Sequence, residues 1–318
     1  MHEVKLLVTG GCGFIGSHFV HLALRKDPEM EIVNLDKLTY AGRLENVSDL
    51  AGNARYKFVK GDILDRELVA KLAKETDGIV HFAAETHVDR SIMKAGEFAE
   101  TDVLGTQSLL EAALGAGHER FFHISTDEVY GSREEGFFGE EDVMQPNSPY
   151  SASKAGAEMM VRAYEKTYGL KATVTRSSNN YGPNQHPEKF IPRAITNLIR
   201  GKKVPIYGNG KNVRDWLYVT DNCEAIYMLL KGKHEGVYNV GAMGGEENIK
   251  IAKDILGIMG KGELEYVEDR KGHDWRYAID TGKISRLGWK PQVKIEEGLK
   301  STVAWYMANR EWWAPLVE

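Results

Sequence analysis

Cysteine is scarce in this sequence, whose 318 residues contain only Cys12 and Cys223. Two cysteines exclude a disulfide-based scaffold and a cysteine-rich zinc site, and they are typical of proteins kept in a reducing compartment. Long apolar runs are also missing, since no segment reaches the ~18 apolar residues that a membrane-spanning helix needs. Strand-like sequence from Val4 onward leaves no room for a signal peptide. We therefore expect a cytoplasmic protein that does not contact a membrane.

Positive charge is not in excess. The chain carries 41 Lys and Arg against 46 Asp and Glu, a net charge of −5, so no basic surface for nucleic acid is expected. Internal repeats and low-complexity segments are missing as well. The remaining composition, 42% hydrophobic and 27% charged, is that of an ordinary globular protein long enough for one large or two modest domains.

The N-terminal segment has the pattern of a βαβ unit. An apolar strand over residues 4–9 is followed at once by the glycine-rich stretch 10–16, a helical pattern over residues 17–26 and a strand over residues 31–36. Gly10 permits a tight turn, Gly13 a close approach to a pyrophosphate, and Gly16 close helix–strand packing. The N–H groups at the start of the helix suit the phosphates. The pattern predicts a dinucleotide site, against the alternative of a structural turn with no ligand.

Asp36 ends the second strand, twenty residues after the last of these glycines. A carboxylate there accepts hydrogen bonds from a ribose diol and repels a 2′-phosphate, so NAD is favoured over NADP. Lys37 would partly offset this preference. Later strand ends carry Asp62, which suits either the adenine edge or a solvated loop, and the small residues Ala83 and Ala84, which let a ligand approach the backbone.

Strand-like and helix-like segments alternate through the first half of the chain. Strands are expected at residues 56–63, 78–84, 121–125 and 171–176, and helices at residues 99–116 and 150–168. This rhythm predicts an α/β fold with a Rossmann-type, doubly wound parallel sheet that binds ligands at the carboxyl ends of its strands.

The rhythm breaks near residue 177. We expect a Rossmann domain over residues 1–176 and a smaller α/β substrate domain over residues 177–318, with a strand near 237–240 returning to the first domain. In the second domain helices are expected at residues 187–200, from 221 and at 295–309, and strands at residues 204–207 and 212–219.

Five polar residues suggest an acid–base site. The strand over residues 121–125 delivers Thr126, Asp127 and Glu128 into a loop, and Tyr150 and Lys154 lie four residues apart on one helix face. Taken alone, the acid pair is typical of a solvated turn and the Tyr–Lys pair of an exposed helix surface. Because the two patterns occur together after a dinucleotide fingerprint, we interpret them as one site.

These motifs resemble a known family. Gly10-x-x-Gly13-x-x-Gly16 with Tyr150-x-x-x-Lys154 is similar to the extended short-chain dehydrogenase/reductase family of nucleotide-sugar enzymes, and the stretch 126–131 resembles its dTDP-glucose 4,6-dehydratases. Further stretches agree with this resemblance over nearly the whole chain, at residues 36–42, 83–91, 178–183, 210–216 and 272–277.

The resemblance implies a lyase that oxidises C4 of dTDP-glucose, removes water across C5–C6 and reduces C6 with the same hydride. Tyr150 would take the C4 hydroxyl proton, its pKa lowered by Lys154 and the nicotinamide, while Thr126 binds the C4 oxygen. Asp127 would protonate the departing C6 hydroxyl, and Glu128 would remove the C5 proton. Adjacent carboxylates raise each other's pKa, which favours one protonated group.

The same resemblance assigns binding residues. Those expected to hold a tightly bound NAD are Gly10, Gly13, Phe14, Ile15, Gly16, Asp36, Lys37, Asp62, Ile63, Ala83, Ala84, Thr101, Tyr150, Lys154 and Asn180. Those expected to hold the sugar nucleotide are His87, Thr126, Asn179, Lys189, Phe190, Pro205, Tyr207, Arg214, Asn248 and His273. Lys189 and Arg214 suit a diphosphate, with a surface or interdomain charge as the alternative. A metal is not expected.

Alternatives remain open on the sequence. The same dehydration of UDP- or CDP-glucose, a nucleotide-sugar 4-epimerase or decarboxylase, and an inactive NAD-binding regulator are the competing readings, and a homodimer is expected by resemblance. Three features depart from the family pattern: Asp102 replaces the usual Asn, Lys271 replaces a common Pro, and the loop over residues 131–149 is short.

Overall fold

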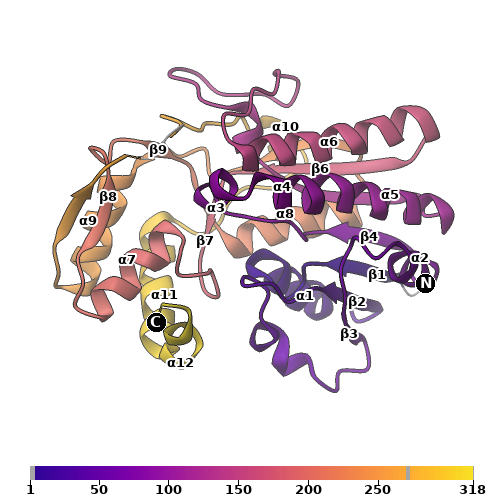
Figure 1. The fold of residues 1–318 in the computed structure, drawn as a ribbon, viewed down its shortest axis with the longest axis horizontal. Helices are drawn as coiled ribbons and strands as arrows, with labels where there is room; N and C mark the ends of the chain where they lie inside the picture. Colours follow the sequence, from indigo (N-terminus) through magenta and orange to yellow (C-terminus); the bar gives the residue numbers. More distant parts are fainter. Residues whose placement is uncertain (1–3, 270–272, 318) are drawn as a thin grey trace.

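The computed structural model describes residues 4–269 and 273–317. Within them seven strands form a parallel central sheet in the order β11-β6-β5-β4-β1-β2-β3 (Figure 1). These are β1 (Val4–Thr9), β2 (Met30–Asp36), β3 (Tyr56–Lys60), β4 (Gly78–His81), β5 (Arg120–Thr126), β6 (Lys171–Ser177) and β11 (Gly236–Val240). The order reverses between β1 and β4, where a doubly wound sheet opens a crevice for ligands. The predicted fold class is confirmed.

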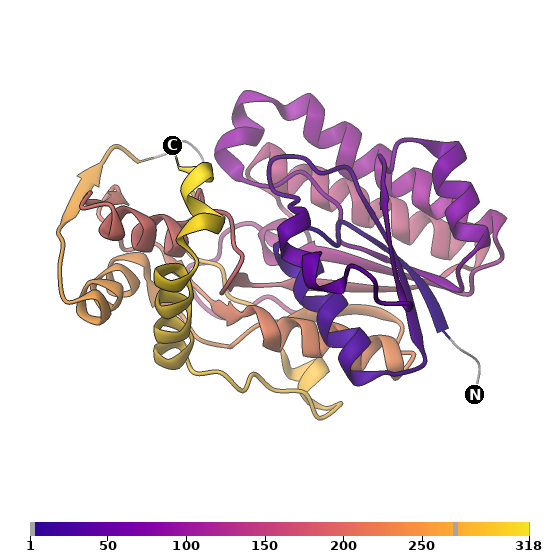
Figure 2. The same ribbon diagram turned by 90° about the horizontal axis from the view of Figure 1, so that it is seen from below.

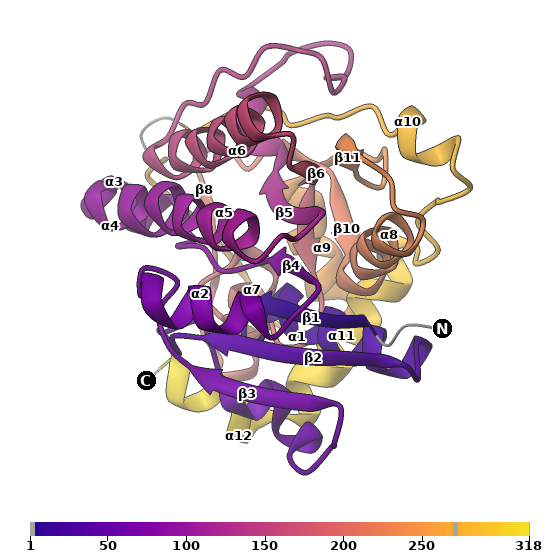
Figure 3. The ribbon, with the colours of Figure 1, turned by 90° about the vertical axis from the view of Figure 1, so that its right-hand side faces the viewer.

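Helices cover both faces of the sheet, which explains the unbroken apolar run of β1. Successive strand residues point to opposite faces. Leu6 and Val8 pack with α1 (Phe14–Lys26) and α8 (Val219–Lys231). Leu7 lies in the cluster of α2 (Arg66–Lys74), α5 (Gly105–Gly115) and α6 (Pro149–Tyr168). Figure 3 shows α2, α5 and α6 on one side of the sheet, and α1 and α8 on the other.

Most of the C-terminal half lies beyond the carboxyl ends of the sheet (Figures 1 and 2). It has its own apolar core, in which Ile195, Ile255 and Tyr306 are fully buried. Its elements are β7 (Asn179–Tyr181), α7 (Phe190–Ile199), β8 (Val204–Tyr207), β9 (Val213–Arg214), β10 (Trp216–Tyr218), β12 (Glu246–Glu247), α9 (Asn248–Met259), β13 (Leu264–Val267), α11 (Ile295–Ala308), α12 (Arg310–Trp313) and η4 (Ala314–Leu316). Three two-stranded pairs, β10–β7, β12–β9 and β13–β8, shape this part.

Three elements of the C-terminal half, β11, α8 and α10 (Gly282–Ser285), lie with the main sheet. β11 covers the residues of the expected returning strand and pairs in parallel with β6, Val237 opposite Val174. α8 packs against α1 and shares its apolar cluster. α10 packs against β11, and its Ile284 belongs to the same apolar cluster. The division of the chain at residue 177 stays a prediction, with β11, α8 and α10 placed on the side of the first unit.

Several element boundaries differ from the sequence prediction. The strands expected at residues 56–63 and 78–84 end at Lys60 and His81, α1 and α8 begin earlier than expected, and α7 begins later. The expected strand 212–219 is interrupted and forms β9 and β10. The helix expected over residues 99–116 is divided among the π-helical η2 (Ala99–Leu104) and α5, after α3 (Val88–Met93) and α4 (Ala95–Phe98). A wider π turn leaves no signature in apolar spacing, so the sequence could not predict it.

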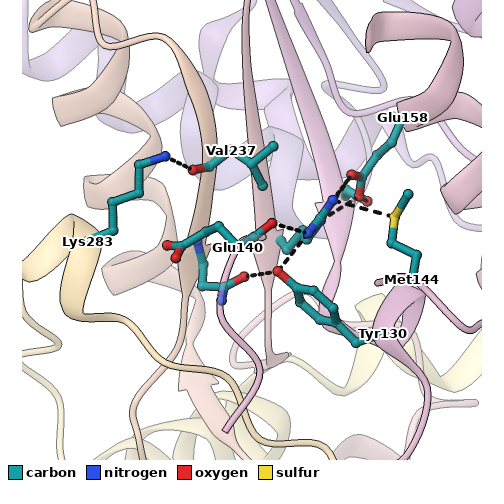
Figure 4. A network of polar contacts seen from close by, with 9 residues as sticks. Tyr130, Glu140, Met144, Glu158, Val237 and Lys283 are labelled. Carbon is teal, nitrogen blue, oxygen red and sulfur yellow. Dashed lines mark hydrogen bonds and ion pairs between the residues drawn. The ribbon is translucent and has the colours of Figure 1, made fainter. Parts of the chain in front are cut away.

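A buried ion pair braces the end of β5 (Figure 4). Arg176 of β6 donates three hydrogen bonds to Glu158 of α6, from Nη2 to Oε2 at 2.7 Å and from Nε to Oε2 and Oε1 at 3.0 and 3.2 Å. It donates one more to the Tyr130 hydroxyl at 2.7 Å. Glu158 also accepts from Ser125 of β5. Tyr130 donates to Asn239 of β11 at 2.8 Å. Three neighbouring strands and α6 are thus joined directly behind the residues that follow Ser125.

Replacing Glu158 by Gln tests this brace. The change leaves the buried guanidinium of Arg176 without an anion, so the free energy of unfolding should fall by about 3–5 kcal/mol, measured by urea denaturation. The matched control is Glu97→Gln, whose ion pair with Lys94 has side chains 55% and 63% exposed and contributes little. A loss for Glu158→Gln no larger than that of the control would contradict the bracing role.

Candidate active site

A glycine-rich turn between β1 and α1 forms one wall of a pocket of about 240 Å³. Gly10 has a φ of +73°, and a Cβ there would lie 2.6 Å from the backbone N of Ala83. A Cβ on Gly16 would lie 2.3 Å from the Gly10 carbonyl oxygen. Larger residues are therefore excluded at both positions. The turn leads directly into α1, whose first N–H groups have no side-chain cap and suit a pyrophosphate.

Asp36 and Lys37 line the same pocket at the end of β2. Asp36 accepts hydrogen bonds from the backbone N of Cys12 at 2.9 Å and of Leu38 at 2.8 Å. Burial raises the pKa of Asp36, and these hydrogen bonds oppose that rise. Lys37 pairs with Asp62, with 2.6 Å between Nζ and Oδ2. The ammonium expected to offset Asp36 is therefore partly neutralised by Asp62.

The predicted cofactor residues come together in this pocket, with one exception. Gly10, Gly13, Phe14, Ile15, Gly16, Asp36, Lys37, Asp62, Ile63, Ala83, Ala84, Thr101, Tyr150 and Lys154 line it. Asn180 lines the neighbouring pocket instead, and its Nδ2 donates to the Ser178 carbonyl oxygen at 2.9 Å. The glycine turn, the helix N-terminus and the carboxylate of Asp36 together fit a dinucleotide.

The start of α6 places Tyr150 and Lys154. Ser148 and Ser151 form a capping box around the first turn, which aligns the helix so that both functional side chains face the sheet. Tyr150 borders both the dinucleotide pocket and the neighbouring pocket. Lys154 is buried and its Nζ donates to the carbonyl oxygen of Ile124 on β5 at 2.7 Å. The junction of the two pockets is therefore occupied by a phenol.

Burial is the main cause of the pKa shifts of this pair. Burial, followed by the carboxylates of Glu128 and Asp102, raises the pKa of Tyr150 well above its usual value, against a hydrogen bond with Thr126. Burial lowers the pKa of Lys154, and Asp102 opposes this. Burial has the largest effect at the phenol, and the expected lowering of its pKa by Lys154 together with the nicotinamide stays a prediction.

Thr126 is the last residue of β5, and Asp127 and Glu128 follow in the 3₁₀ turn η3 (Asp127–Tyr130) rather than in an open loop. The Thr126 hydroxyl caps this turn by accepting a hydrogen bond from the Glu128 N at 3.2 Å. Asp127 is 2% exposed, and its Oδ2 has no hydrogen-bond partner among the described residues. Burial, then Glu128 and Asp215, raise the pKa of Asp127 well above its usual range. These surroundings favour the protonated form of Asp127.

Asp102 lies buried behind Tyr150 and Lys154. Its Oδ1 accepts from the Glu85 N at 2.8 Å, and its Oδ2 accepts from the Ser153 Oγ at 2.5 Å. Burial raises the pKa of Asp102 to about 6, against Lys154 and the two hydrogen bonds. Both carboxyl oxygens of Asp102 thus accept a hydrogen bond. The acid therefore stands where the family usually has Asn without leaving a buried polar atom unpaired. Lys271, the second departure, lies outside the described residues.

The neighbouring pocket, of about 270 Å³, contains all the predicted substrate residues. They are His87, Thr126, Asn179, Lys189, Phe190, Pro205, Tyr207, Arg214, Asn248 and His273. Lys189 donates to the Thr86 Oγ1 at 3.0 Å, and the buried Arg214 donates to the Asp274 carbonyl oxygen at 2.8 Å. The side-chain oxygens of Asn179 and Asn248 are buried and have no hydrogen-bond partner within the described part of the chain. Those amides suit polar groups of a ligand.

Sequence reasoning missed several residues that border the two pockets. Arg193 lines the second pocket one helical turn after Lys189, a spacing that indicates a shared face and was the available signal. Glu188 and Thr86 border both pockets. Their place in the pockets depends on contacts between segments distant in sequence, which the pattern of a single sequence does not reveal.

Over residues 4–269 and 273–317, no helix has the length and apolar character needed to cross a membrane. The same residues include no group of three or more His, Cys, Asp and Glu side chains placed to hold a metal ion.

Known proteins resemble this chain along nearly its full length. Residues 7–302 match the family model described as GDP-mannose 4,6 dehydratase. The dTDP-glucose 4,6-dehydratase of Streptomyces niveus is 49% identical, over 98% of this chain and 96% of that protein.

Solved structures agree with the sequence comparison. The crystal structure of DesIV, a dTDP-glucose 4,6-dehydratase from Streptomyces venezuelae with NAD and TYD bound, has a TM-score of 0.96 at 49% identity, over 98% of this chain and 100% of that one. A UDP-glucose 4-epimerase from Thermus thermophilus in complex with NAD has a TM-score of 0.90 at 32% identity, over 96% and 100% of the two chains. This chain therefore belongs to the GDP-mannose 4,6-dehydratase family, and within it to the group of the dTDP-glucose 4,6-dehydratases.

Proposed function

We propose that the protein is an NAD-dependent lyase that converts dTDP-glucose to dTDP-4-keto-6-deoxyglucose and water. The observation that carries this proposal is the pair of adjacent carboxyl groups, Asp127 and Glu128, beside Tyr150 at the junction of the two pockets. An elimination needs one acid and one base on neighbouring carbons, and the raised pKa of Asp127 separates the two roles. The dehydratases of Streptomyces niveus and Streptomyces venezuelae are 49% identical to this chain.

The pocket next to the glycine turn would hold NAD. Gly10 and Gly16 allow the pyrophosphate to approach the start of α1, and Asp36 would accept hydrogen bonds from the adenosine ribose. Because Lys37 is paired with Asp62, the carboxylate of Asp36 faces a ribose without a matched positive charge and disfavours a 2′-phosphate. The bound nicotinamide supplies a hydride acceptor and donor and a positive charge that lowers the pKa of the phenol.

Tyr150 acts first in this mechanism by taking the proton of the C4 hydroxyl as hydride leaves C4. Thr126 orients the C4 oxygen from the end of β5. The ammonium of Lys154 is held in place by its hydrogen bond to the Ile124 carbonyl oxygen. The resulting C4 ketone acidifies the proton on C5.

Glu128 then removes the C5 proton, and Asp127 donates its proton to the C6 hydroxyl, which leaves as water. Hydride returns to C6, and a proton returns to C5. Lys189 and Arg214 would bind the diphosphate, with Asn179, Asn248 and His273 nearby. Pro205 and Tyr207 would flank the base, and His87, Asn180 and Phe190 would complete the sugar pocket.

Competing activities share much of this geometry. The epimerase of Thermus thermophilus has a similar fold, but epimerisation does not require an acid for C6, which Asp127 provides here. Measuring the turnover of dTDP-, UDP- and CDP-glucose in parallel shows which nucleobase the protein prefers. We propose that the dTDP sugar reacts fastest.

We also propose a cytoplasmic homodimer. Neighbouring elements α3, η2 and α6 expose Ile92, Met93, Leu104 and Met159, which are 43–76% accessible. A second copy of the chain would cover these apolar side chains. Analytical ultracentrifugation measures the assembly state directly.

Asp127→Asn tests the elimination step. The amide cannot donate an acidic proton to the leaving hydroxyl, so product formation should fall by about a hundredfold or more, while NADH and the 4-keto-glucose intermediate accumulate in a single turnover followed by absorbance and mass spectrometry. Asp49→Asn, at a side chain 67% exposed, is the control and should behave as the unaltered protein. Normal dehydration by Asp127→Asn would refute the assigned acid.

Tyr150→Phe tests the oxidation step. Without the phenolic oxygen the C4 proton has no acceptor, so NADH formation in a single turnover should slow by about a hundredfold or more, although bound NAD is retained. Tyr168→Phe, at the exposed far end of the same helix, should form NADH at the unaltered rate. Rapid NADH formation by Tyr150→Phe would exclude the phenol as the base.

A further inference from the structure

Separate segments of the chain border the pocket proposed for NAD. They are the loop after β2, with Thr39, Ala41 and Gly42, the segment after β4, with Glu85 and Thr86, and the loop before α7, with Gln185, His186, Glu188 and Lys189. The first two belong to the Rossmann part, and the third belongs to the C-terminal half. A ligand in this pocket is therefore enclosed by segments far apart in sequence.

Glu188 is where contacts from these segments converge. Its Oε1 accepts a hydrogen bond from the Tyr40 hydroxyl at 2.8 Å, and its Oε2 accepts one from the Arg90 Nε at 2.9 Å. Arg90 also lies over the Tyr40 ring, with its Cζ 3.5 Å from the ring centre. The Tyr40 oxygen is 3.1 Å from the carbonyl oxygen of Thr86. Tyr40, Arg90 and Glu188, which we call the latch, thus join the loop after β2, helix α3 and the loop before α7.

The surroundings keep the latch hydrogen bonds charge-assisted. Burial raises the pKa of Glu188, but Lys189, His87 and the hydrogen bonds from Tyr40 and Arg90 outweigh it and lower the pKa. Burial and Glu188 raise the pKa of Tyr40, so the phenol keeps the proton that it donates. The Glu188 side chain is 15% exposed, which limits competition from water. Hydrogen bonds to a charged group in such a setting are among the stronger ones in proteins.

We propose that the latch retains NAD in the pocket between turnovers. This inference rests on the proposed function, in which the hydride taken from C4 returns to C6, so NAD ends each cycle in the form in which it began. Release would require the loops before α7 and after β2 to separate, which breaks the contacts of Glu188. The three latch side chains are positioning residues, since they act by holding the walls of the pocket.

The rate of NAD release tests this proposal. Holoenzyme carrying radiolabelled NAD is diluted into excess unlabelled NAD, and the label that remains bound is followed by rapid gel filtration. Tyr40→Phe keeps the ring against Arg90 but removes the hydroxyl, and Glu188→Gln removes the charge. Each should release NAD about tenfold faster or more, because a hydrogen bond to a charged group contributes at least that factor. Release as slow as in the unaltered protein would overturn the latch.

Matched controls make the same replacements at exposed sites. Tyr168→Phe alters a side chain 60% exposed on α6, and Glu263→Gln alters one 71% exposed in an ion pair with Lys203. Both should release NAD at the unaltered rate. Thermal unfolding of every variant verifies that faster release does not come from loss of the fold.

A double variant distinguishes one latch from independent contacts. If Tyr40 and Glu188 act as a unit, Tyr40→Phe combined with Glu188→Gln should release NAD little faster than Glu188→Gln alone. Effects that multiply would contradict the latch. Unaltered protein that holds no NAD would contradict both the latch and the proposed function, whereas slow release from all variants of a protein that dehydrates dTDP-glucose would contradict the latch alone.

Discussion

The repulsion between the neighbouring carboxyl groups of Asp127 and Glu128 is the interaction on which the proposed chemistry depends. Both face one pocket at the end of β5, where burial weakens solvation of charge. Burial, followed by the charges of Glu128 and Asp215, raises the pKa of Asp127 well above its usual range, which favours its protonated form. In the proposed reaction these two adjacent side chains act as acid and base, which is what removal of water from neighbouring carbons requires.

This arrangement demands a rigid support, because a misplaced acid or base loses most of its effect. The support comes from groups behind the pocket: Arg176 and Glu158 join β5, β6 and α6, and Thr126 caps the turn that carries both carboxyl groups. The contacts of Glu188 do the same for the loops around the dinucleotide pocket. Buried polar networks thus hold in place the two carboxyl groups and the loops around the dinucleotide pocket at the end of the sheet.

Local patterns predicted the parts of the protein that depend on local physics. The glycine turn, the acid at the end of β2 and the spacing of Tyr150 and Lys154 each require particular residues at particular positions, so the sequence contains them directly. The π turn in η2, the pairing of Lys37 with Asp62 and the place of Asn180 in the second pocket depend on tertiary contacts. The raised pKa of Tyr150 also depends on tertiary structure, because burial and then the carboxylates of Glu128 and Asp102 raise it. The catalytic and binding roles themselves stay proposals.

In the proposed reaction one site oxidises, dehydrates and reduces the same hexose with a hydride that never leaves the pocket. Incubation of the protein with dTDP-glucose carrying deuterium at C4, followed by mass spectrometry and NMR of the product, tests it most directly. We expect a product lighter by one molecule of water, with a ketone at C4 and the deuterium transferred to C6. A product that retains all its oxygen atoms, or one whose C6 carries no deuterium, would contradict the proposed reaction.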